Sequence, residues 1–336
     1  MRKTVLLSTS ACWNCGDDWI REGLLTCLGL RSDVRVLWWN RGWGVKPEFG
    51  NSLAVNLDLA DYVIMAGTPE WIDLNEGIYK HCLRRGKRMA LLGVGRTGGF
   101  DEERHEALMG RAREVVDLAI ARDDIAAGYL ERFGIPHTVM CDPALFCEPV
   151  GNDGQMSVVG YRGIGLGPGE KNSHHVIRGG GQSAELDIIL VDAFHALPAP
   201  KLVTVHDNRE VRAAEELFGG QHVFYSSNPA DLFRAYAGCG YYIGARIHGF
   251  VAALLHGAAA QLIYPTDKAV TMETAITRLG LAGHAKVQVM GTDSGIVPYL
   301  GLEAIGQHEI RKRLAEESAA FRAKCKAVGW LGALMR

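Results

Sequence analysis

Short apolar runs that alternate with amphipathic segments constrain the fold of this chain more than any other feature. The alternation predicts strand–helix units and mainly parallel sheets, because parallel strands need a crossover connection that is usually a helix. We expect strands at 4–8, 33–39, 62–66, 88–93, 118–123, 137–141, 157–162, 201–207, 222–226, 241–246 and 260–264. We expect helices near 17–29, 70–86, 101–117, 123–133, 182–196, 208–219, 229–238, 248–257 and 267–280.

A length of 336 residues makes two domains the default and one large domain the alternative. The pattern stops in the loop "EPVGNDG" and begins again with "SVVGYR", so we place α/β domains at 1–150 and 151–300. In the segment 301–336, a charged helix at about 303–327 is expected to pack back across both domains. Two doubly wound domains in series predict a ligand-binding cleft between the carboxyl edges of two sheets.

The composition excludes several classes of protein. It is globular, with 48% hydrophobic and 22% charged residues, and the net charge of -2 argues against a nucleic-acid partner. No apolar run approaches the roughly 20 residues of a membrane span, and the start of the chain soon meets two aspartates, unlike a signal peptide. Eight irregularly spaced cysteines fit a reducing compartment, so we expect a cytoplasmic protein.

The stretch "ACWNCGDDWIREGLL" contains a C-x-x-C that has three interpretations: a redox pair, half of a metal site, or two incidental thiols. No second ligand pair accompanies Cys12 and Cys15, so the first two are disfavoured. The segment also holds Asn14, Gly16 and Asp17 at a turn into a helix, where free backbone N–H groups favour an anion or a hydroxyl. Whether Asp17 binds a ligand or only caps the helix stays open.

The stretch "YYIGARIHGFVAALLHG" places Arg246 and His248 after a predicted strand. If the segment stays extended, both side chains face one way and Ile247 faces the core. A guanidinium beside an imidazole could bind a carboxylate or phosphate and move a proton, and Gly249 allows close backbone approach. The alternative is a buried structural histidine and a surface arginine.

Other polar residues follow predicted strands, and each has an alternative structural role. Arg122 precedes two aspartates. It either braces these two carboxylates or projects into the predicted cleft. The remaining ones are Arg96, Arg162, His206, Tyr264 and Lys268.

Taken in order, these motifs resemble the polysaccharide pyruvyl transferase family over roughly residues 10–280. The resemblance rests on N-x-G-D-D, two glycine-containing turns, an Arg-Asp followed by D-P-A, and the G-x-R-x-H-G segment. In this chain these motifs hold Asn14, Gly16, Asp17 and Asp18; "IMAGTPEW" and "LLGVGRTGG"; Arg122, Asp123, Asp142, Pro143 and Ala144; and Arg246, His248, Gly249, Tyr264 and Lys268. The stiff turn at Pro69 and the glycine-rich loop at 163–181 depart from the family pattern.

The resemblance implies two Rossmann-like domains in a GT-B-like arrangement, with the acceptor on the N-terminal side and the donor on the C-terminal side. It implies phosphoenolpyruvate as donor substrate, a glycan or lipid-linked saccharide as acceptor, a cyclic pyruvate ketal as product and a place in exopolysaccharide or cell-envelope biosynthesis. Association with the membrane would then be peripheral, through the acceptor. No metal or other cofactor is implied.

The roles that follow are hypotheses. Arg122 and Arg246 would hold the anionic groups of the donor, His248 would be the general acid/base, and Asp17 would orient or deprotonate an acceptor hydroxyl. The further substrate-binding candidates are Asn14, Gly16, Arg96, Arg162, Gly249, Tyr264 and Lys268. The alternatives are a GT-B-type glycosyltransferase that uses a sugar nucleotide, and a catalytically silent relative.

Overall fold

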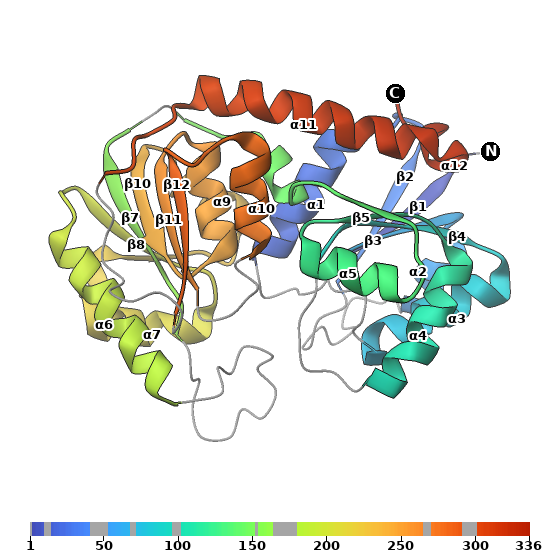
Figure 1. Ribbon diagram of the computed structural model, residues 1–336, viewed down its shortest axis with the longest axis horizontal. Coiled ribbons are helices and arrows are strands. Elements are labelled where there is room, and N and C mark those ends of the chain that lie inside the picture. Colours follow the sequence, from blue (N-terminus) through green and yellow to red (C-terminus); the bar gives the residue numbers. More distant parts are fainter. Residues whose placement is uncertain are drawn as a thin grey trace. The chain divides into compact units, whose positions relative to one another are not determined.

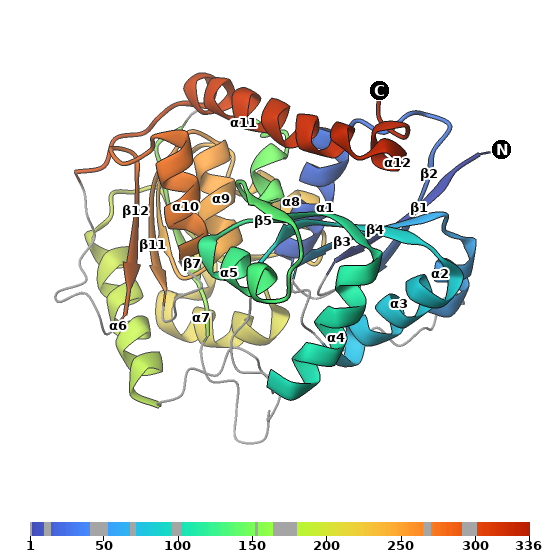
Figure 2. The same ribbon diagram turned by 45° about the vertical axis from the view of Figure 1, so that its right-hand side comes forward.

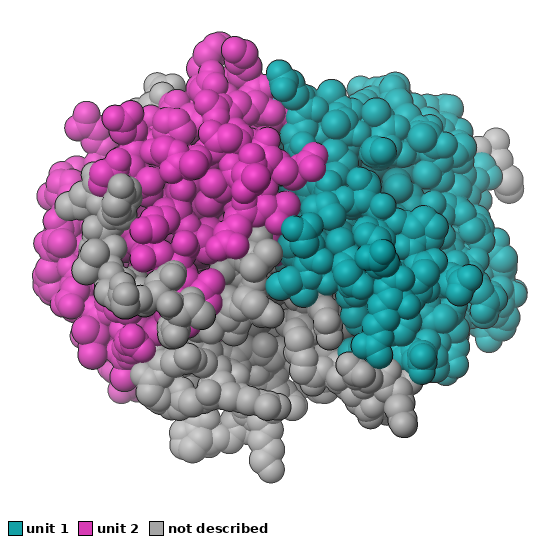
Figure 3. All heavy atoms as spheres, in the orientation of Figure 1, with its two compact units in different colours: residues 1–13, 17–147, 315–336 teal, residues 14–16, 148–314 magenta. Residues whose placement is uncertain are grey.

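The computed structural model describes residues 2–9, 15–40, 53–67, 72–95, 102–151, 154–163, 180–264, 270–290 and 301–336. Along these residues the chain forms two compact units, which Figure 3 distinguishes by colour. Unit 1 comprises Met1–Trp13, Asp17–Cys147 and Ala315–Arg336. Unit 2 comprises Asn14–Gly16 and Glu148–Leu314.

Unit 1 contains a six-stranded parallel sheet in the order β2-β1-β3-β4-β5-β6 (Figure 1). Its strands are β1 (Thr4–Thr9), β2 (Arg35–Asn40), β3 (Tyr62–Gly67), β4 (Arg88–Val94), β5 (Val116–Ala121) and β6 (His137–Val139). The chain passes from β1 outward to β2 and then returns to the other side of β1 as β3. The order of this sheet therefore reverses between β1 and β3, which is the place where open α/β sheets bind ligands.

The helices of unit 1 pack on both faces of the sheet. They are α1 (Cys15–Leu28), α2 (Leu53–Leu59), α3 (Ile72–Arg85), α4 (Glu102–Val115), α5 (Asp124–Arg132), the 3₁₀ turn η1 (Pro143–Phe146) and α12 (Gly329–Gly332). Leu57, Tyr79 and Met109, from α2, α3 and α4, share one core with Leu6 and Val63 of the sheet. Leu7 and Ile64 are as deeply buried and, being the next residues along their strands, face the opposite side.

Unit 2 contains a second six-stranded parallel sheet in the order β12-β11-β10-β7-β8-β9. Its strands are β7 (Met156–Tyr161), β8 (Lys201–Val205), β9 (Val223–Tyr225), β10 (Cys239–Gly244), β11 (Ala259–Tyr264) and β12 (Ala285–Val289). The chain runs from β7 to β8 and β9, then returns to the other side of β7 as β10. The reversal in unit 2 therefore lies between β7 and β10.

The helices of unit 2 cover both faces of its sheet, with α6 and α7 on one face and α9 and α10 on the other (Figures 1 and 2). They are α6 (Gly180–Ala196), η2 (Asn208–Glu210), α7 (Val211–Phe218), η3 (Gly220–His222), α8 (Pro229–Arg234), α9 (Ile247–Leu255) and α10 (Val270–Leu279). On the α6–α7 face, Leu186 and Phe194 pack on Val203 and Ile243.

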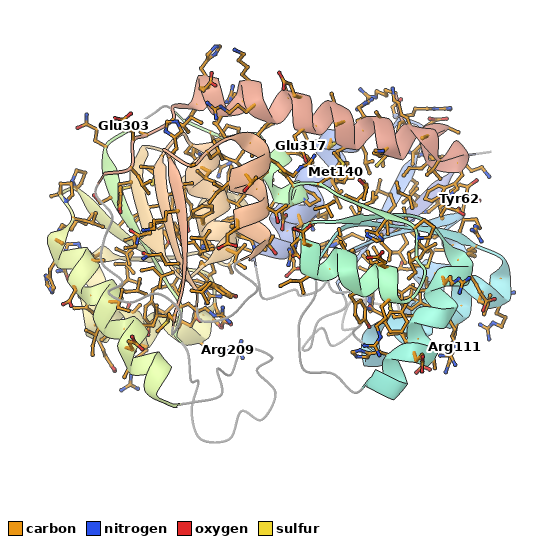
Figure 4. The ribbon with its side chains drawn as sticks, viewed as in Figure 1. Tyr62, Arg111, Met140, Arg209, Glu303 and Glu317 are labelled. Carbon is orange, nitrogen blue, oxygen red and sulfur yellow. The ribbon has the colours of Figure 1, made fainter. Side chains whose placement is uncertain are left out.

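The long helix α11 (Gln307–Ala327) belongs to unit 2 up to Leu314 and to unit 1 from Ala315 onward. Within unit 1, the Glu317 carboxylate accepts the backbone N–H of Cys141 at 2.9 Å, and Figure 4 labels Glu317 beside Met140. Arg322 Nη1 also donates to the carbonyl of Cys27 on α1 at 3.0 Å. These contacts fix the second part of α11 on unit 1.

The predicted fold class, two α/β domains with mainly parallel sheets, is confirmed. All eleven predicted strands are present, and the structure adds β12, α2 and α12, which were not predicted. The strand β12 ("AKVQV") is half polar because it lies at the edge of its sheet, and that composition concealed it. The helix α2 has only seven residues, too few to show helical periodicity.

Candidate functional site

The polar residues of unit 2 gather at the carboxyl edge of its sheet. Arg162 follows β7, His206 follows β8, Arg246 follows β10 and Tyr264 ends β11. These four strands are consecutive neighbours in the sheet, and β7 and β10 flank the reversal of strand order. Parallel strands direct all four residues to the same edge, which therefore forms the candidate site.

Arg246 is held by a buried carboxylate that the sequence analysis did not single out. Its Nη2 forms a short ion pair with Glu210 Oε2, and its Nε donates to the carbonyl of Tyr161 at 3.2 Å. Burial by itself would lower the pKa of Arg246, but Glu210 and Asp207 outweigh it and raise the pKa above its ordinary value. Arg246 therefore stays charged, and its fork is oriented by the protein.

Glu210 and Arg162 complete this charged cluster. Glu210 is only 4% exposed, and burial raises its pKa even though Arg246 and Arg162 oppose the shift. The Nη1 of Arg162 donates to the hydroxyl of Tyr264, and its guanidinium carbon lies 5.1 Å from the centre of that ring. Two guanidinium groups thus lie within electrostatic range of one buried carboxylate.

His206 belongs to a chain of hydrogen bonds that runs from Cys15 to β8 within unit 2. Its Nδ1 lies 3.2 Å from Cys15 Sγ, and its Nε2 lies 2.8 Å from the hydroxyl of Tyr236. That hydroxyl also lies 2.9 Å from Thr204 Oγ1. Burial, together with Arg246 and His248, lowers the pKa of His206 well below its ordinary value, so the imidazole is neutral.

His248 lies against Gly16 within unit 2. A Cβ built on Gly16 would be 1.9 Å from His248 Nδ1, so the imidazole occupies space that any other residue at position 16 would need. A Cβ on Gly249 would be 2.7 Å from each of the hydroxyl oxygens of Tyr236 and Tyr242. Gly16 therefore allows close packing against His248, and Gly249 allows close packing against the two tyrosines.

The backbone around His248 differs from the expected extended segment. β10 ends at Gly244 and α9 begins at Ile247, with Arg246 as its N-cap. His248 consequently stands in the first turn of a helix, and the two-residue alternation of a strand does not apply to it. The side chain of Ile247 is buried, as predicted.

In unit 1, the two aspartates of the opening motif lie in the first turn of α1 and are both buried. Asp18 Oδ1 accepts a hydrogen bond from Arg21 Nη1 at 3.0 Å. Burial raises the pKa of Asp18 to about 6, because the loss of solvation outweighs the attraction of Arg21. A carboxyl group with such a pKa exchanges its proton close to neutrality, which makes Asp18 a candidate beside Asp17.

Arg122 is 4% exposed and forms an ion pair with Asp142, with 2.7 Å between Nη1 and Oδ2. It therefore braces the D-P-A segment, while Asp123 caps α5 and also interacts electrostatically with Arg122. A Cβ on Gly95 would be 2.3 Å from Arg122 Nε, an atom for which the described residues offer no hydrogen-bond partner. The role of Arg122 as a donor ligand stays a prediction.

Pro143 occupies the space that a side chain would need at two further glycines of unit 1. Its ring fills the space in which a Cβ of Gly93 would lie, at 2.2 Å, and Gly93 has a positive φ of 68°. Its carbonyl oxygen lies 1.8 Å from the position of a Cβ on Gly23 of α1. The D-P-A motif thus joins the end of β4 to α1, which is a structural role.

The structure brings together six of the predicted site residues in unit 2: Gly16, Arg162, Arg246, His248, Gly249 and Tyr264. Asp17 and Arg122 lie in unit 1. Asn14, Arg96 and Lys268 lie outside the described residues, as do Cys12 and the glycine-rich loop. Glu210 and Tyr236 escaped sequence reasoning because each lies in an ordinary helical or turn pattern, whereas His206 was noted only for following a strand.

Two further findings concern metal binding and membrane-spanning helices. Within the described ranges, no group of three or more His, Cys, Asp or Glu side chains could hold a metal ion. Nor does any helix there have the length and apolarity that crossing a bilayer requires.

Comparisons with known proteins give a family and a fold. The family model for polysaccharide pyruvyl transferase matches residues 14–260. No match was found among the curated proteins. A protein from Listeria monocytogenes assigned as a UDP-N-acetylglucosamine 2-epimerase is similar in structure, with a TM-score of 0.52 and 13% identity over 96% of this chain and 91% of that one.

Two further solved structures are more distant. The UDP-GlcNAc 2-epimerase from Methanocaldococcus jannaschii has a TM-score of 0.45 and 9% identity, over 93% of this chain and 92% of that one. UGT89C1 from Arabidopsis thaliana, complexed with UDP-L-rhamnose, has a TM-score of 0.45 and 11% identity, over 96% and 92%. At these identities the likeness concerns the fold alone.

Proposed function

Because the chain belongs to the polysaccharide pyruvyl transferase family, we propose that it moves the enolpyruvyl group of phosphoenolpyruvate onto two hydroxyls of a sugar. The product is a pyruvate ketal on a glycan or lipid-linked saccharide, and phosphate is released. The observation that carries the proposal is the cluster at the carboxyl edge of the sheet in unit 2. There the Arg246 and His248 of the family motif join Arg162 and Tyr264.

The donor carries a carboxylate and a phosphate, so its binding requires cations. Arg246 and Arg162 supply two guanidinium groups, which match both anions through paired N–H donors. The Nε of Arg246 is already fixed by the carbonyl of Tyr161, so the fork is oriented before the donor arrives. Arg122 remains a further candidate donor ligand from unit 1.

Ketal formation has a defined proton balance. The two sugar hydroxyls lose two protons, of which one goes to the methylene carbon of the donor and the other leaves with phosphate. The central carbon gains two sugar oxygens, and its bond to the phosphate oxygen breaks. His248 is the proposed general acid/base, a role that typically contributes about 10² to 10⁴ in rate. Asp17 is the proposed group that orients or deprotonates an acceptor hydroxyl, and Asp18 can exchange a proton near neutrality.

The hydrogen bonds of His206 hold its imidazole in place. Both of its ring nitrogens have partners, Cys15 and Tyr236, and its pKa is lowered well below the ordinary value. A neutral imidazole tied at both nitrogens is suited to hold its neighbours in place rather than to shuttle protons. We therefore assign proton transfer to His248 alone among the two.

The test measures phosphate release from phosphoenolpyruvate by the full chain with a panel of lipid-linked and nucleotide-linked glycans. The expected result is release that depends on both donor and acceptor, with a ketal in the product mass. Thermal stabilisation is measured in parallel with phosphoenolpyruvate and with UDP- and GDP-sugars. Stabilisation by a sugar nucleotide alone would indicate a glycosyltransferase, and donor binding without phosphate release would indicate a silent relative.

A further inference from the structure

Glu210 places a carboxylate against Arg246, the arginine that is proposed to bind the donor. Glu210 is almost fully buried, and its Oε2 is paired with Arg246 Nη2. It is the N-cap residue of α7, yet its side chain makes no capping hydrogen bond. The side chain is therefore directed to the arginine and serves no local purpose in its own helix.

Among the described residues, Glu210 is the sole carboxylate that forms an ion pair with Arg246. Asp207 is engaged by Arg209, with 2.9 Å between its Oδ1 and Arg209 Nε, and this contact keeps its pKa below the ordinary value despite burial. Arg162 is within electrostatic range of Glu210 and donates to Tyr264. His206 is neutral. Arg246 and Arg162 therefore both interact with the carboxylate of Glu210.

We propose that Glu210 is an internal stand-in for the ligand: it holds Arg246 in the empty site, and an anionic group of the donor displaces it. The inference rests on the proposed function in that Arg246 and Arg162 are taken to bind the donor. A side-chain carboxylate and a ligand carboxylate or phosphate compete for the same fork of N–H donors. The bond from Arg246 Nε to Tyr161 keeps the guanidinium oriented while the exchange occurs.

A purely structural role for Glu210 predicts the opposite sign of effect. If Glu210 only orients Arg246, its removal should disorder the guanidinium and weaken anion binding. If Glu210 is a competitor, its removal should strengthen anion binding, because one buried negative charge no longer repels the ligand. The sign of the change therefore decides between the two roles.

The experiment titrates inorganic phosphate into the full chain and its Glu210→Gln variant by calorimetry at one pH and ionic strength. The expected result is binding tighter by about tenfold or more in the variant, which corresponds to about 1.4 kcal/mol. Glu216→Gln is the matched control, because it removes the same charge from the exposed side of α7. Unchanged or weaker phosphate binding by Glu210→Gln would overturn the proposal.

The variant leaves Arg246 without its partner, so its folding must be checked. Unfolding that is reversed by added phosphate supports the proposal, because an external anion then replaces the missing carboxylate. If Glu210→Gln does not fold at any phosphate concentration, Glu210→Asp decides, since it keeps the charge but withdraws it by one methylene. An affinity for phosphate at least about threefold higher is expected there, and no gain would refute the idea.

The outcome is separable from that of the proposed function. Tighter phosphate binding without ketal formation would keep the stand-in role and reject the transferase reaction. Ketal formation by the natural chain, together with weaker phosphate binding by Glu210→Gln, would support the transferase reaction and reject the stand-in role.

Discussion

The Sγ of Cys15 lies 3.2 Å from Nδ1 of His206, although 191 positions separate the two residues in the sequence. Cys15 stands at the start of α1 and forms no disulfide among the described cysteines, and His206 follows β8. The imidazole is neutral because burial, first of all, lowers its pKa. In this structure, the second cysteine of the C-x-x-C is therefore the hydrogen-bond partner of a histidine.

We expect Cys15→Ser to keep turnover within about threefold of the natural chain, because a hydroxyl can also hydrogen-bond to the imidazole. The initial rate of phosphate release measures this. A loss of about a hundredfold or more would mean that the thiol itself reacts. Cys147→Ser, at a thiol that donates to the carbonyl of Trp19, controls for loss of packing.

Gly16→Ala should impair the reaction through His248. The new methyl group would lie 1.9 Å from the ring nitrogen, and the imidazole is the part that can move aside. We expect a loss of rate approaching that of His248→Ala, about 10² or more, with the fold retained. Gly110→Ala is the control, since no atom lies within 4 Å of its Cβ and a helix gains about 0.5–1 kcal/mol from the change. Equal rates for the two alanine variants would contradict this view of His248.

Arg246→Lys should lose most of the affinity for phosphoenolpyruvate while the circular dichroism spectrum stays unchanged. An ammonium is a point charge and cannot present paired N–H donors to the anions of the donor while the carbonyl of Tyr161 fixes its orientation. Titration of the donor measures the effect. Arg212→Lys on the exposed face of α7 serves as the comparison. Undiminished donor affinity would remove Arg246 from the binding site.

Asp142→Asn should destabilise unit 1 by about 3–5 kcal/mol, because it removes the ion-pair partner of the buried Arg122 guanidinium. Denaturant unfolding at neutral pH measures the change. Glu216→Gln, which breaks the exposed pair with Arg212, should barely alter the transition. A small effect of Asp142→Asn would show that Arg122 does not depend on this bracing and would strengthen its candidacy as a donor ligand.

Asp18 should make stability depend on pH in an unusual direction. Its folded pKa of about 6 exceeds its ordinary value of 3.8, so the folded state holds an extra proton between these values. Stability relative to Asp18→Asn is therefore expected to fall as pH rises from about 4 to about 6, by about 1–3 kcal/mol in all. Unfolding of both proteins across this range tests it. A difference that rises or stays level with pH would refute the buried-acid assignment, and Asp124→Asn, at an exposed position, gives the comparison.

The sequence by itself determined the fold class, because alternating strand and helix periods admit few other architectures. It also indicated the strand ends that carry Arg162, Arg246 and Tyr264, since residues after parallel strands converge on one edge. The edge strand β12 and the short helix α2 were not predicted, because a half-polar strand and a seven-residue helix give too weak a sequence pattern.

Only the tertiary structure decided how these residues are paired. Arg122 meets Asp142, Arg246 meets Glu210, and Cys15 meets His206, over sequence separations of 20, 36 and 191 positions. Local periodicity reports which face of an element is buried, but it carries no information on which distant side chain lies opposite. That choice depends on strand order and helix packing. For Arg246, which was expected to bind an anion of the ligand, the tertiary structure supplies the carboxylate of Glu210 as its partner.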